Sequence, residues 1–253
     1  MTSPDHSTAA ALATAAGRLL LDVRARDFDH ADDRKAAGDA EAHRFLVDRL
    51  AQLRPEDAVL SEEGADDPVR LVSERVWIVD PLDGTREFSE PGRTDWAVHV
   101  ALWERGELVA GAVALPAAGL TLGTDDGHRV PARKDGPVRL AVSRSRPPSL
   151  VQALSVRLGA QLVPMGSAGV KAMSVVRGET DAYVHGGGQF EWDSAAPVAV
   201  ARAAGLHTSR LDGSPLRYNQ PDPYLPDLLV CRPELADGLL SAIAEQVGQH
   251  LPG

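Results

Sequence analysis

The fold is decided by residues 77–85, which read Trp-Ile-Val-Asp-Pro-Leu-Asp-Gly-Thr. The run that leads into this stretch, residues 75–79, is apolar on both faces, as expected of a buried strand. The strand is expected to stop at Asp80, because the proline that follows restricts the backbone before it. Asp80 and Asp83 can then converge on one point with the Leu82 carbonyl between them. Hard cations such as Mg²⁺ prefer oxygen ligands of this kind.

The two residues after these acids predict a phosphate site. Gly84 and Thr85 would open a helix, and the free N–H groups of its first turn suit a phosphate oxygen. The alternative is a plain surface turn, since Asp, Pro and Gly are common turn formers. Two acids placed directly after a strongly apolar strand favour the ligand site over the turn.

Three more acids follow or precede expected elements. Glu62, with Glu63 beside it, follows a short apolar step, while Asp39 and Asp193 stand before expected helices. The adjacent glutamates also fit a solvated loop. Asp39 and Asp193 also fit helix N-caps, each worth about 1 kcal/mol of helix stability. Taken one at a time, these acids leave both interpretations open.

The remaining pattern predicts a layered α+β or α/β fold with a mostly antiparallel first sheet. Helices are expected over residues 12–23, 42–53, 149–158, 168–177, 194–204 and 234–247, and strands over residues 58–60, 75–79, 96–103, 108–115, 140–143, 161–163, 181–185 and 228–231. Residues 29–38 are expected to be irregular, a further strand pair is expected around residues 125–127, and residues 186–188 are expected to form a loop. The chain is expected to form one domain, residues 1–253, with halves at about 1–133 and 134–253.

Net charge and cysteine content limit the partners and the cellular compartment that we expect for this protein. The 253 residues carry a formal net charge of −10, and an acidic surface repels nucleic acids and anionic membranes. The single cysteine, Cys231, excludes an intrachain disulfide and fits a reducing compartment. These features predict a soluble, cytoplasmic protein that binds neither nucleic acid nor a membrane.

The order of the acidic motifs resembles the inositol monophosphatase superfamily, whose members are magnesium-dependent, lithium-inhibited phosphatases. The resemblance rests on Glu62-Glu63, the motif at residues 80–85, and Trp192-Asp193, in that order. It implies an αβαβα sandwich and hydrolysis of a phosphate monoester by a metal-activated water, without a covalent phosphoenzyme. It also implies two to three Mg²⁺ ions and is compatible with a homodimer.

The resemblance also implies roles for single residues. Glu62, Asp80 and the Leu82 carbonyl would hold the first metal; Asp80, Asp83 and Asp193 would hold the second; and a weaker third would sit by Glu62 and Asp39. Thr85, together with Asp39, would position the attacking water. Gly84 and Thr85 would bind the phosphate through backbone N–H groups.

Within the superfamily, the chain is most similar to the CysQ-type bisphosphate nucleotidases. The similarity lies in Arg86-Glu87-Phe88, in residues 143–146, in Gly166-Ser167 followed by Lys171, and in residues 191–196. It implies hydrolysis of 3'-phosphoadenosine 5'-phosphate to AMP, as part of sulfate assimilation, with phosphoadenosine phosphosulfate as a further substrate. The substrate-binding residues would be Gly84, Thr85, Arg144, Arg146, Gly166, Ser167, Lys171 and Asp193.

Alternatives stay open at this point. The basic residues Arg144, Arg146 and Lys171 also fit ordinary solvated surface, and Tyr183, Phe190 and Tyr218 fit the core as well as a stacking platform for adenine. The superfamily also contains inositol monophosphatases, fructose-1,6-bisphosphatase-like enzymes and histidinol-phosphate phosphatases, so the substrate is a phosphorylated nucleotide or a sugar. A non-catalytic metal or nucleotide binder on the same fold is the alternative outside the enzymes.

Overall fold

The computed structural model describes residues 4–248; residues 1–3 and 249–253, the two ends of the expected domain, lie outside the described part. The N-terminal half contains α1 (Pro4–Arg24), α2 (Ala31–Leu53), β1 (Ala58–Ser61), η1 (Pro68–Leu71), β2 (Arg75–Asp83), α3 (Thr85–Ser89), β3 (Ala97–Glu104), β4 (Glu107–Leu115), η2 (Pro116–Ala118) and β5 (Leu120–Gly123). The C-terminal half contains β6 (Arg139–Ser143), α4 (Ser149–Leu158), β7 (Gln161–Met165), α5 (Ala168–Val176), β8 (Ala182–Phe190), α6 (Glu191–Ala203), β9 (His207–Ser209), β10 (Tyr224–Cys231), η3 (Pro233–Leu235) and α7 (Ala236–Gly248).

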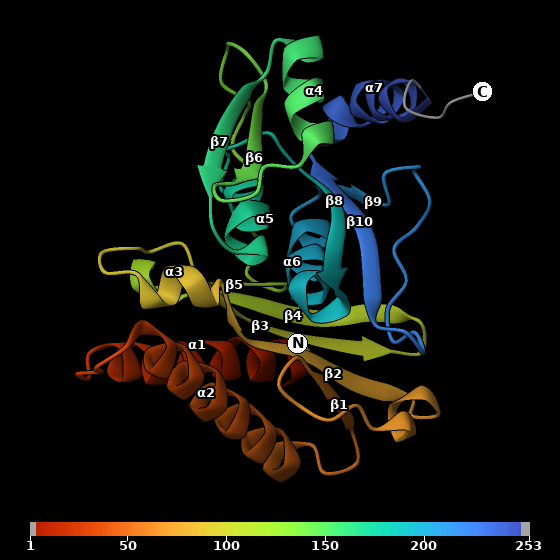
Figure 1. Cartoon of the computed structure of the whole chain (residues 1–253). Helices are drawn as coiled ribbons and strands as arrows, with labels where there is room; N and C mark the ends of the chain where they lie inside the picture. Colours follow the sequence, from red (N-terminus) through yellow and green to blue (C-terminus); the bar gives the residue numbers. More distant parts are fainter. Residues whose placement is uncertain (1–3, 249–253) are drawn as a thin grey trace.

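The elements stack in five layers (Figure 1). Helices α1 and α2 cover one face of the first sheet, α5 and α6 lie between the two sheets, and α4 and α7 cover the far face of the second sheet. Three clusters of buried apolar side chains fill the spaces between these layers. The αβαβα sandwich that the resemblance implies is therefore confirmed.

The first sheet has the order β1-β2-β3-β4-β5. Strands β1 and β2 are parallel and all other neighbours are antiparallel, as expected. The strand pair expected around residues 125–127 is wrong, because β5 ends at Gly123 and the described chain forms no further strand before Arg139.

The expectation of an irregular segment over residues 29–38 is also wrong, because α2 begins at Ala31. Its first turn carries Asp32 and Asp33, whose charges suit the positive end of the helix dipole. Gly38 does not interrupt the helix, because it lies against α3: a Cβ on Gly38 would stand 2.8 Å from the Phe88 ring. The polar residues of this segment form a solvated helix surface.

The second sheet has the order β7-β6-β8-β10-β9, with β6 parallel to β7 and β8, and β10 antiparallel to β8 and β9. The glycines at 186–188 lie inside β8, so the expected loop is wrong. Gly187 and Gly188 take positive φ angles of 115° and 80°, which glycine adopts without strain. They stand opposite an irregularity in β10 between Leu225 and Asp227. The short strand β9 was not predicted.

No described helix is long and apolar enough to cross a membrane.

Candidate active site

The acidic motif lies where β2 leaves the first sheet. The strand continues past Asp80 and ends at Asp83, so its expected end at Asp80 is three residues short. Its pairing with β3 is irregular between Asp80 and Asp83, and this irregularity releases the backbone of the motif from the regular ladder. The Leu82 N–H donates to Asp80 Oδ1 at 3.0 Å, and the Thr85 hydroxyl donates to the Leu82 carbonyl at 3.3 Å.

Gly84 joins the strand to α3 in a conformation that needs glycine. Its φ is +87°, and a Cβ would stand 3.2 Å from both the Asp95 carbonyl oxygen and the Ser167 side chain. The turn therefore brings the motif close to the start of α5 in the C-terminal half.

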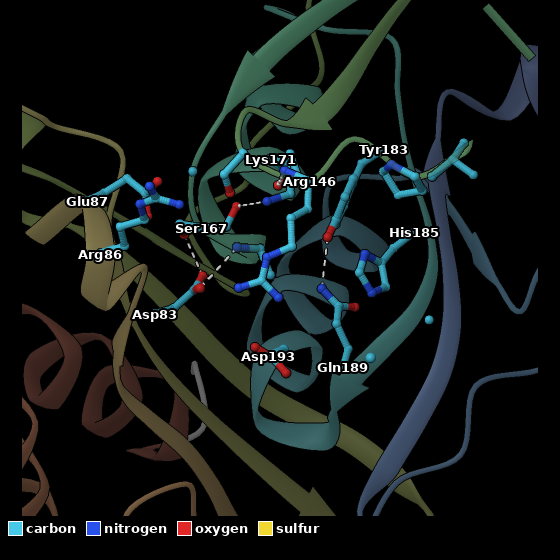
Figure 2. A pocket seen from close by; sticks show the side chains of 18 residues that line it. Asp83, Arg86, Glu87, Arg146, Ser167, Lys171, Tyr183, His185, Gln189 and Asp193 are labelled. Carbon is cyan, nitrogen blue, oxygen red and sulfur yellow. Dashed lines mark hydrogen bonds between the residues drawn. The ribbon is translucent and has the colours of Figure 1, made fainter. Parts of the chain in front are cut away.

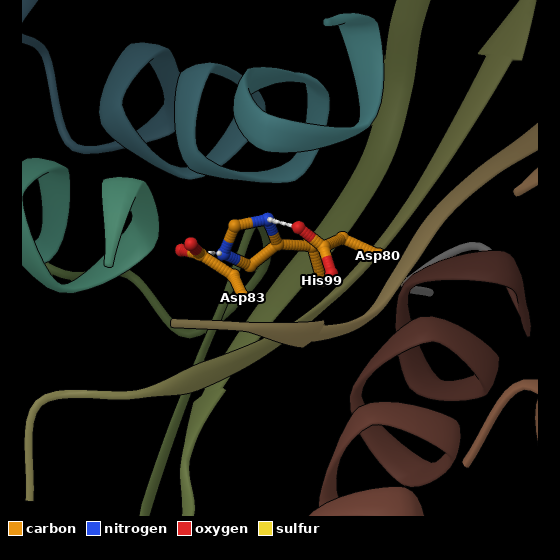
Figure 3. A group of neighbouring side chains, drawn as sticks. All are labelled: Asp80, Asp83 and His99. Atoms are coloured by element: carbon orange, nitrogen blue, oxygen red, sulfur yellow. Dashed lines mark ion pairs between the residues drawn. The ribbon is translucent and has the colours of Figure 1, made fainter. Parts of the chain in front are cut away.

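Asp83 joins the two halves of the chain. It accepts hydrogen bonds from the Ser167 hydroxyl, from the Ala168 N–H at 3.1 Å and from the Gly169 N–H at 2.7 Å, so it binds the N-terminus of α5. The His99 ring of β3 reaches the same carboxylate, with Nε2 3.1 Å from Oδ2, as Figure 3 shows.

His99 is a site residue that the sequence reasoning missed. It is fully buried, its Nδ1–H donates to the Trp192 carbonyl at 3.0 Å, and Nδ1 stands 3.8 Å from Asp80 Oδ2. A Cβ on Gly169 would lie 2.1 Å from Nε2, so only glycine leaves room for the ring. The available signal was a single polar residue within the apolar run that became β3.

The charges of the cluster suit the binding of a cation. Burial and the charge of Glu62 raise the pKa of Asp80 well above its usual value. Burial of the carboxyl and the charge of Asp193 raise the pKa of Glu62 to about 7, although the residue as a whole is exposed. Burial and the charge of Asp83 raise the pKa of Asp193 to about 6. Asp80 Oδ2 has no hydrogen-bond partner among the described residues, and acids that repel one another in this way suit a divalent cation.

Asp83 behaves in the opposite way. Burial alone would raise its pKa, but the His99 ring, together with Lys171 and Ser167, outweighs burial and holds the pKa at about 2. The same contact raises the pKa of His99 against the effect of its own burial. Asp80, Asp83 and His99 form a buried group in which one ligand atom from each lies within 4.8 Å of the others.

Neither of the two remaining acids is the residue before its helix, although the Asp193 side chain still caps the start of α6. Asp193 is the third residue of α6, where it accepts a hydrogen bond from the Phe190 N–H at 2.7 Å, rather than the residue before the helix. Asp39 lies inside α2, where burial and the charge of Glu63 raise its pKa to about 7.

A cavity of about 490 Å³ opens beside this cluster (Figure 2). Its lining includes the acids Asp83 and Asp193, the cations Arg146 and Lys171, and Gly166 and Ser167. A volume of this size holds a nucleotide-sized ligand. Arg144 does not line the cavity, because its guanidinium binds Glu87 at 2.7 Å and Glu90 at 2.6 Å.

Lys171 is the buried cation of the cavity. It donates to the Ser167 carbonyl at 2.6 Å, lies 5.3 Å from the centre of the Tyr183 ring, and has a pKa lowered by burial. Tyr183 lines the cavity. The other two aromatic candidates do not: Phe190 stacks on Trp192, and Tyr218 is buried.

Comparison with known proteins is consistent with this geometry. The model of the inositol monophosphatase family matches residues 2–249, and the chain belongs to this family. A 3'-phosphoadenosine 5'-phosphate phosphatase of Mycobacterium tuberculosis is 57% identical, over 91% of this chain and 90% of the relative. The 3'(2'),5'-bisphosphate nucleotidase CysQ of Escherichia coli is 32% identical, over 75% of this chain and 81% of the relative. The crystal structure of CysQ from Bacteroides thetaiotaomicron superposes with a TM-score of 0.78 at 28% identity, over 90% of this chain and 97% of that chain.

Proposed function

We propose that this enzyme is a magnesium-dependent 3'(2'),5'-bisphosphate nucleotidase that hydrolyses 3'-phosphoadenosine 5'-phosphate to AMP and phosphate, and that also accepts phosphoadenosine phosphosulfate. One observation carries the proposal: a single cavity joins the acidic cluster of Asp83 and Asp193 to the cations Lys171 and Arg146. A monophosphate needs only the acidic end. A substrate with two phosphates uses both ends, and similarity to the mycobacterial and CysQ relatives supports the same substrate.

The donors present fit two Mg²⁺ ions that share Asp80. Glu62 and the Leu82 carbonyl would complete one site, and Asp83 and Asp193 the other. When bound, such ions lower the pKa of a water and stabilise charge on the phosphate and leaving oxygens. A third, weaker site would lie by Glu62 and Asp39.

The protein's own groups position the reactants. The Thr85 hydroxyl, beside the Leu82 carbonyl, would orient the attacking water together with Asp39. With a pKa of about 7, Asp39 can accept a proton near neutral pH. The backbone N–H groups of Gly84 and Thr85 would bind the phosphate that is removed.

The second phosphate would bind Lys171 and Arg146, bordered by Gly166 and Ser167. Arg146 is exposed and forms no ion pair with any described residue, so its charge is available to a ligand. Arg144 would reach that phosphate only after leaving Glu87 and Glu90. We therefore assign Arg144 a supporting role, in which it holds the segment that carries Arg146.

The test is phosphate release with Mg²⁺ from 3'-phosphoadenosine 5'-phosphate, inositol 1-phosphate, fructose 1,6-bisphosphate and histidinol phosphate, compared by kcat/KM. We expect the bisphosphate nucleotide to lead by at least about tenfold. Asp83→Asn should abolish release while the circular dichroism spectrum is kept, whereas Asp48→Asn, the same change at an exposed position of α2, should have no effect. A lead for a sugar or inositol phosphate would contradict the nucleotidase assignment. Binding without release would favour a non-catalytic binder.

Two further features belong to the proposal. A cytoplasmic location is supported by the free, buried thiol of Cys231. A homodimer is the state suggested by resemblance to the superfamily, and light scattering of the purified protein would test it.

A further inference from the structure

One part of the cavity wall is polar and carries no acidic or basic side chain that is charged at neutral pH. Tyr183, His185 and Gln189 line it, together with the backbone of Gly187 and Gly188. All five residues belong to β8, whose glycines leave the cavity open at this point. These side chains suit hydrogen bonds to an uncharged part of a substrate.

Gln189 carries a buried acceptor that nothing satisfies. The residue is only 5% exposed, and its Nε2–H donates to the Tyr183 hydroxyl at 2.8 Å. This bond turns the amide so that Oε1 faces the side of the His185 ring, as Figure 2 shows. Among the residues that the structure describes, Oε1 has no hydrogen-bond partner. A buried carbonyl left without a donor is costly, so this atom is suited to a donor on a ligand.

His185 adds a second acceptor on the same wall. Burial and the charge of Lys171 lower the pKa of His185 to about 4, so the ring is neutral at neutral pH. A neutral imidazole carries one proton, and the contact with the Gly187 backbone favours a proton on the ring nitrogen that faces it. Nε2 has no partner in the described part of the chain, which leaves it as an acceptor.

We propose that His185 and Gln189 bind the exocyclic amino group of the substrate's base, and that this contact selects adenine over a 6-oxopurine. This inference rests on the proposed nucleotidase function. An amino group has two N–H donors, which match two acceptors, whereas a carbonyl oxygen in the same place would face Gln189 Oε1 and His185 Nε2 without a proton between them. The lining of the cavity supports the assignment, because it offers acids for the phosphate removed, Lys171 and Arg146 for the second phosphate, and uncharged side chains for the base.

The orientation of the Gln189 amide decides whether the site prefers a 6-amino or a 6-oxo purine. In the orientation observed, Nε2 donates to the Tyr183 hydroxyl and Oε1 is free to accept. The opposite orientation would present Nε2–H to the ligand and would favour a 6-oxo group. Tyr183 is therefore a positioning residue for the selection.

The experiment compares kcat/KM for adenosine 3',5'-bisphosphate and inosine 3',5'-bisphosphate. For the wild type we expect a ratio of at least about tenfold in favour of adenosine, as one satisfied buried hydrogen bond provides. Gln189→Met and His185→Phe keep the side-chain volume and remove the acceptors, so each should bring the ratio toward one. Gln161→Met, the same change at an exposed position of β7, should leave the ratio as it is. Tyr183→Phe should reduce the ratio by freeing the amide.

A wild-type ratio near one, or a preference for inosine, would overturn the inference, as would a high ratio that survives both Gln189→Met and His185→Phe. Calorimetric binding of AMP and IMP separates this inference from the proposed function, since binding needs no turnover. If neither bisphosphate nucleotide is hydrolysed, the proposed function fails. The proposed amino-group site is then supported only if AMP binds more tightly than IMP and Gln189→Met removes the difference. Equal affinities for AMP and IMP would contradict it.

Discussion

The Nε2 atom of His99 lies 3.1 Å from Asp83 Oδ2, while the Nδ1–H on the other side of the ring donates to the Trp192 carbonyl. The ring thus stands between the end of β2 and the first turn of α6, the helix that carries Asp193. Asp83 and Asp193 belong to the same proposed metal site but lie in different halves of the chain. His99 therefore fixes the spacing on which that site depends.

Removing the ring should weaken metal binding. For His99→Leu we expect kcat/KM to fall by at least about tenfold and the Mg²⁺ concentration for half-maximal activity to rise, because Asp83 loses a contact that holds it. A magnesium titration of phosphate release measures both. His128→Leu, a change on a loop where the histidine pairs with exposed Asp126, serves as the control. If the magnesium requirement of His99→Leu is unchanged, the ring contributes to core packing but not to metal binding.

Gly169 and His99 should prove energetically coupled. Gly169→Ala places a methyl 2.1 Å from Nε2, so the ring must move, and we expect a loss of about 1–3 kcal/mol in the free energy of unfolding. In Gly169→Ala/His99→Ala the clash is gone, so the double variant should be more stable than the sum of the two single changes. Urea unfolding of the four proteins measures the coupling. Additive losses would contradict a contact between these positions.

Without metal, the stability of the protein should fall as pH rises. The pKa values of Glu62 and Asp39, each raised to about 7, and of Asp193, raised to about 6, mean that the folded state holds these protons longer than the unfolded chain does. Their contribution is complete below about pH 4, where the unfolded acids are protonated, and is lost as pH rises through about 6 to 7. The lowered pKa of Asp83 acts in the opposite direction only at lower pH, because it is about 2. The lowered pKa of His185, about 4, also acts in the opposite direction and reduces the decline below about pH 6.5, but it is one group against three.

The measurement is the melting temperature in EDTA and in excess Mg²⁺ between pH 5 and pH 8. We expect the EDTA curve to decline over this range and the stabilisation by Mg²⁺ to grow, since ions replace protons on the acids. A metal-free protein whose melting temperature rises steadily from pH 5 to pH 8 would contradict the raised pKa values of Glu62, Asp39 and Asp193.

The sequence predicted the parts of the site that are local. The motif at residues 80–85 lies within one strand end and the turn after it, so spacing alone brought Asp80 and Asp83 together. Asp193 and Asp39 were ambiguous, because an acid at a helix start and an acid in a ligand site look the same in sequence. His99 could not be assigned, since its contacts come from the neighbouring strand β2 and from α5 and α6, which lie far along the chain.

The wrong predictions also concern residues whose structure depends on partners far along the chain. Three successive glycines are typical of a loop, yet β10 pairs with Gly186 and with Gln189, on either side of Gly187 and Gly188, and so keeps all three glycines in β8. Arg144 and Arg146 are two residues apart and alike in sequence. Only the approach of α3, which brings Glu87 to Arg144, separates the arginine that is engaged from the one that faces the cavity.

This difference between the two arginines can be measured. Arg146→Ala should raise KM for adenosine 3',5'-bisphosphate about tenfold and leave KM for 3'-AMP nearly unchanged, because the second phosphate loses a cation at the cavity wall. Arg144→Ala should have a smaller effect on KM, and it should lower the melting temperature by removing the ion pairs with Glu87 and Glu90. Equal effects of the two changes on the KM for the bisphosphate would contradict the assignment.

Far from the site, a buried ion pair holds the second sheet together. Asp181 is fully buried just before β8, and it accepts from Arg139 at the start of β6 and from Arg232 after the end of β10. The two arginines overcome burial and lower the pKa of Asp181. Asp181→Asn keeps the shape but leaves both guanidinium groups without their countercharge, so it should cost about 3–5 kcal/mol of unfolding free energy. Glu74→Gln, which breaks the exposed pair with Arg105, should cost less than about 1 kcal/mol. Urea unfolding measures both; a loss in Asp181→Asn as small as that in Glu74→Gln would mean that the buried charge does not stabilise the sheet.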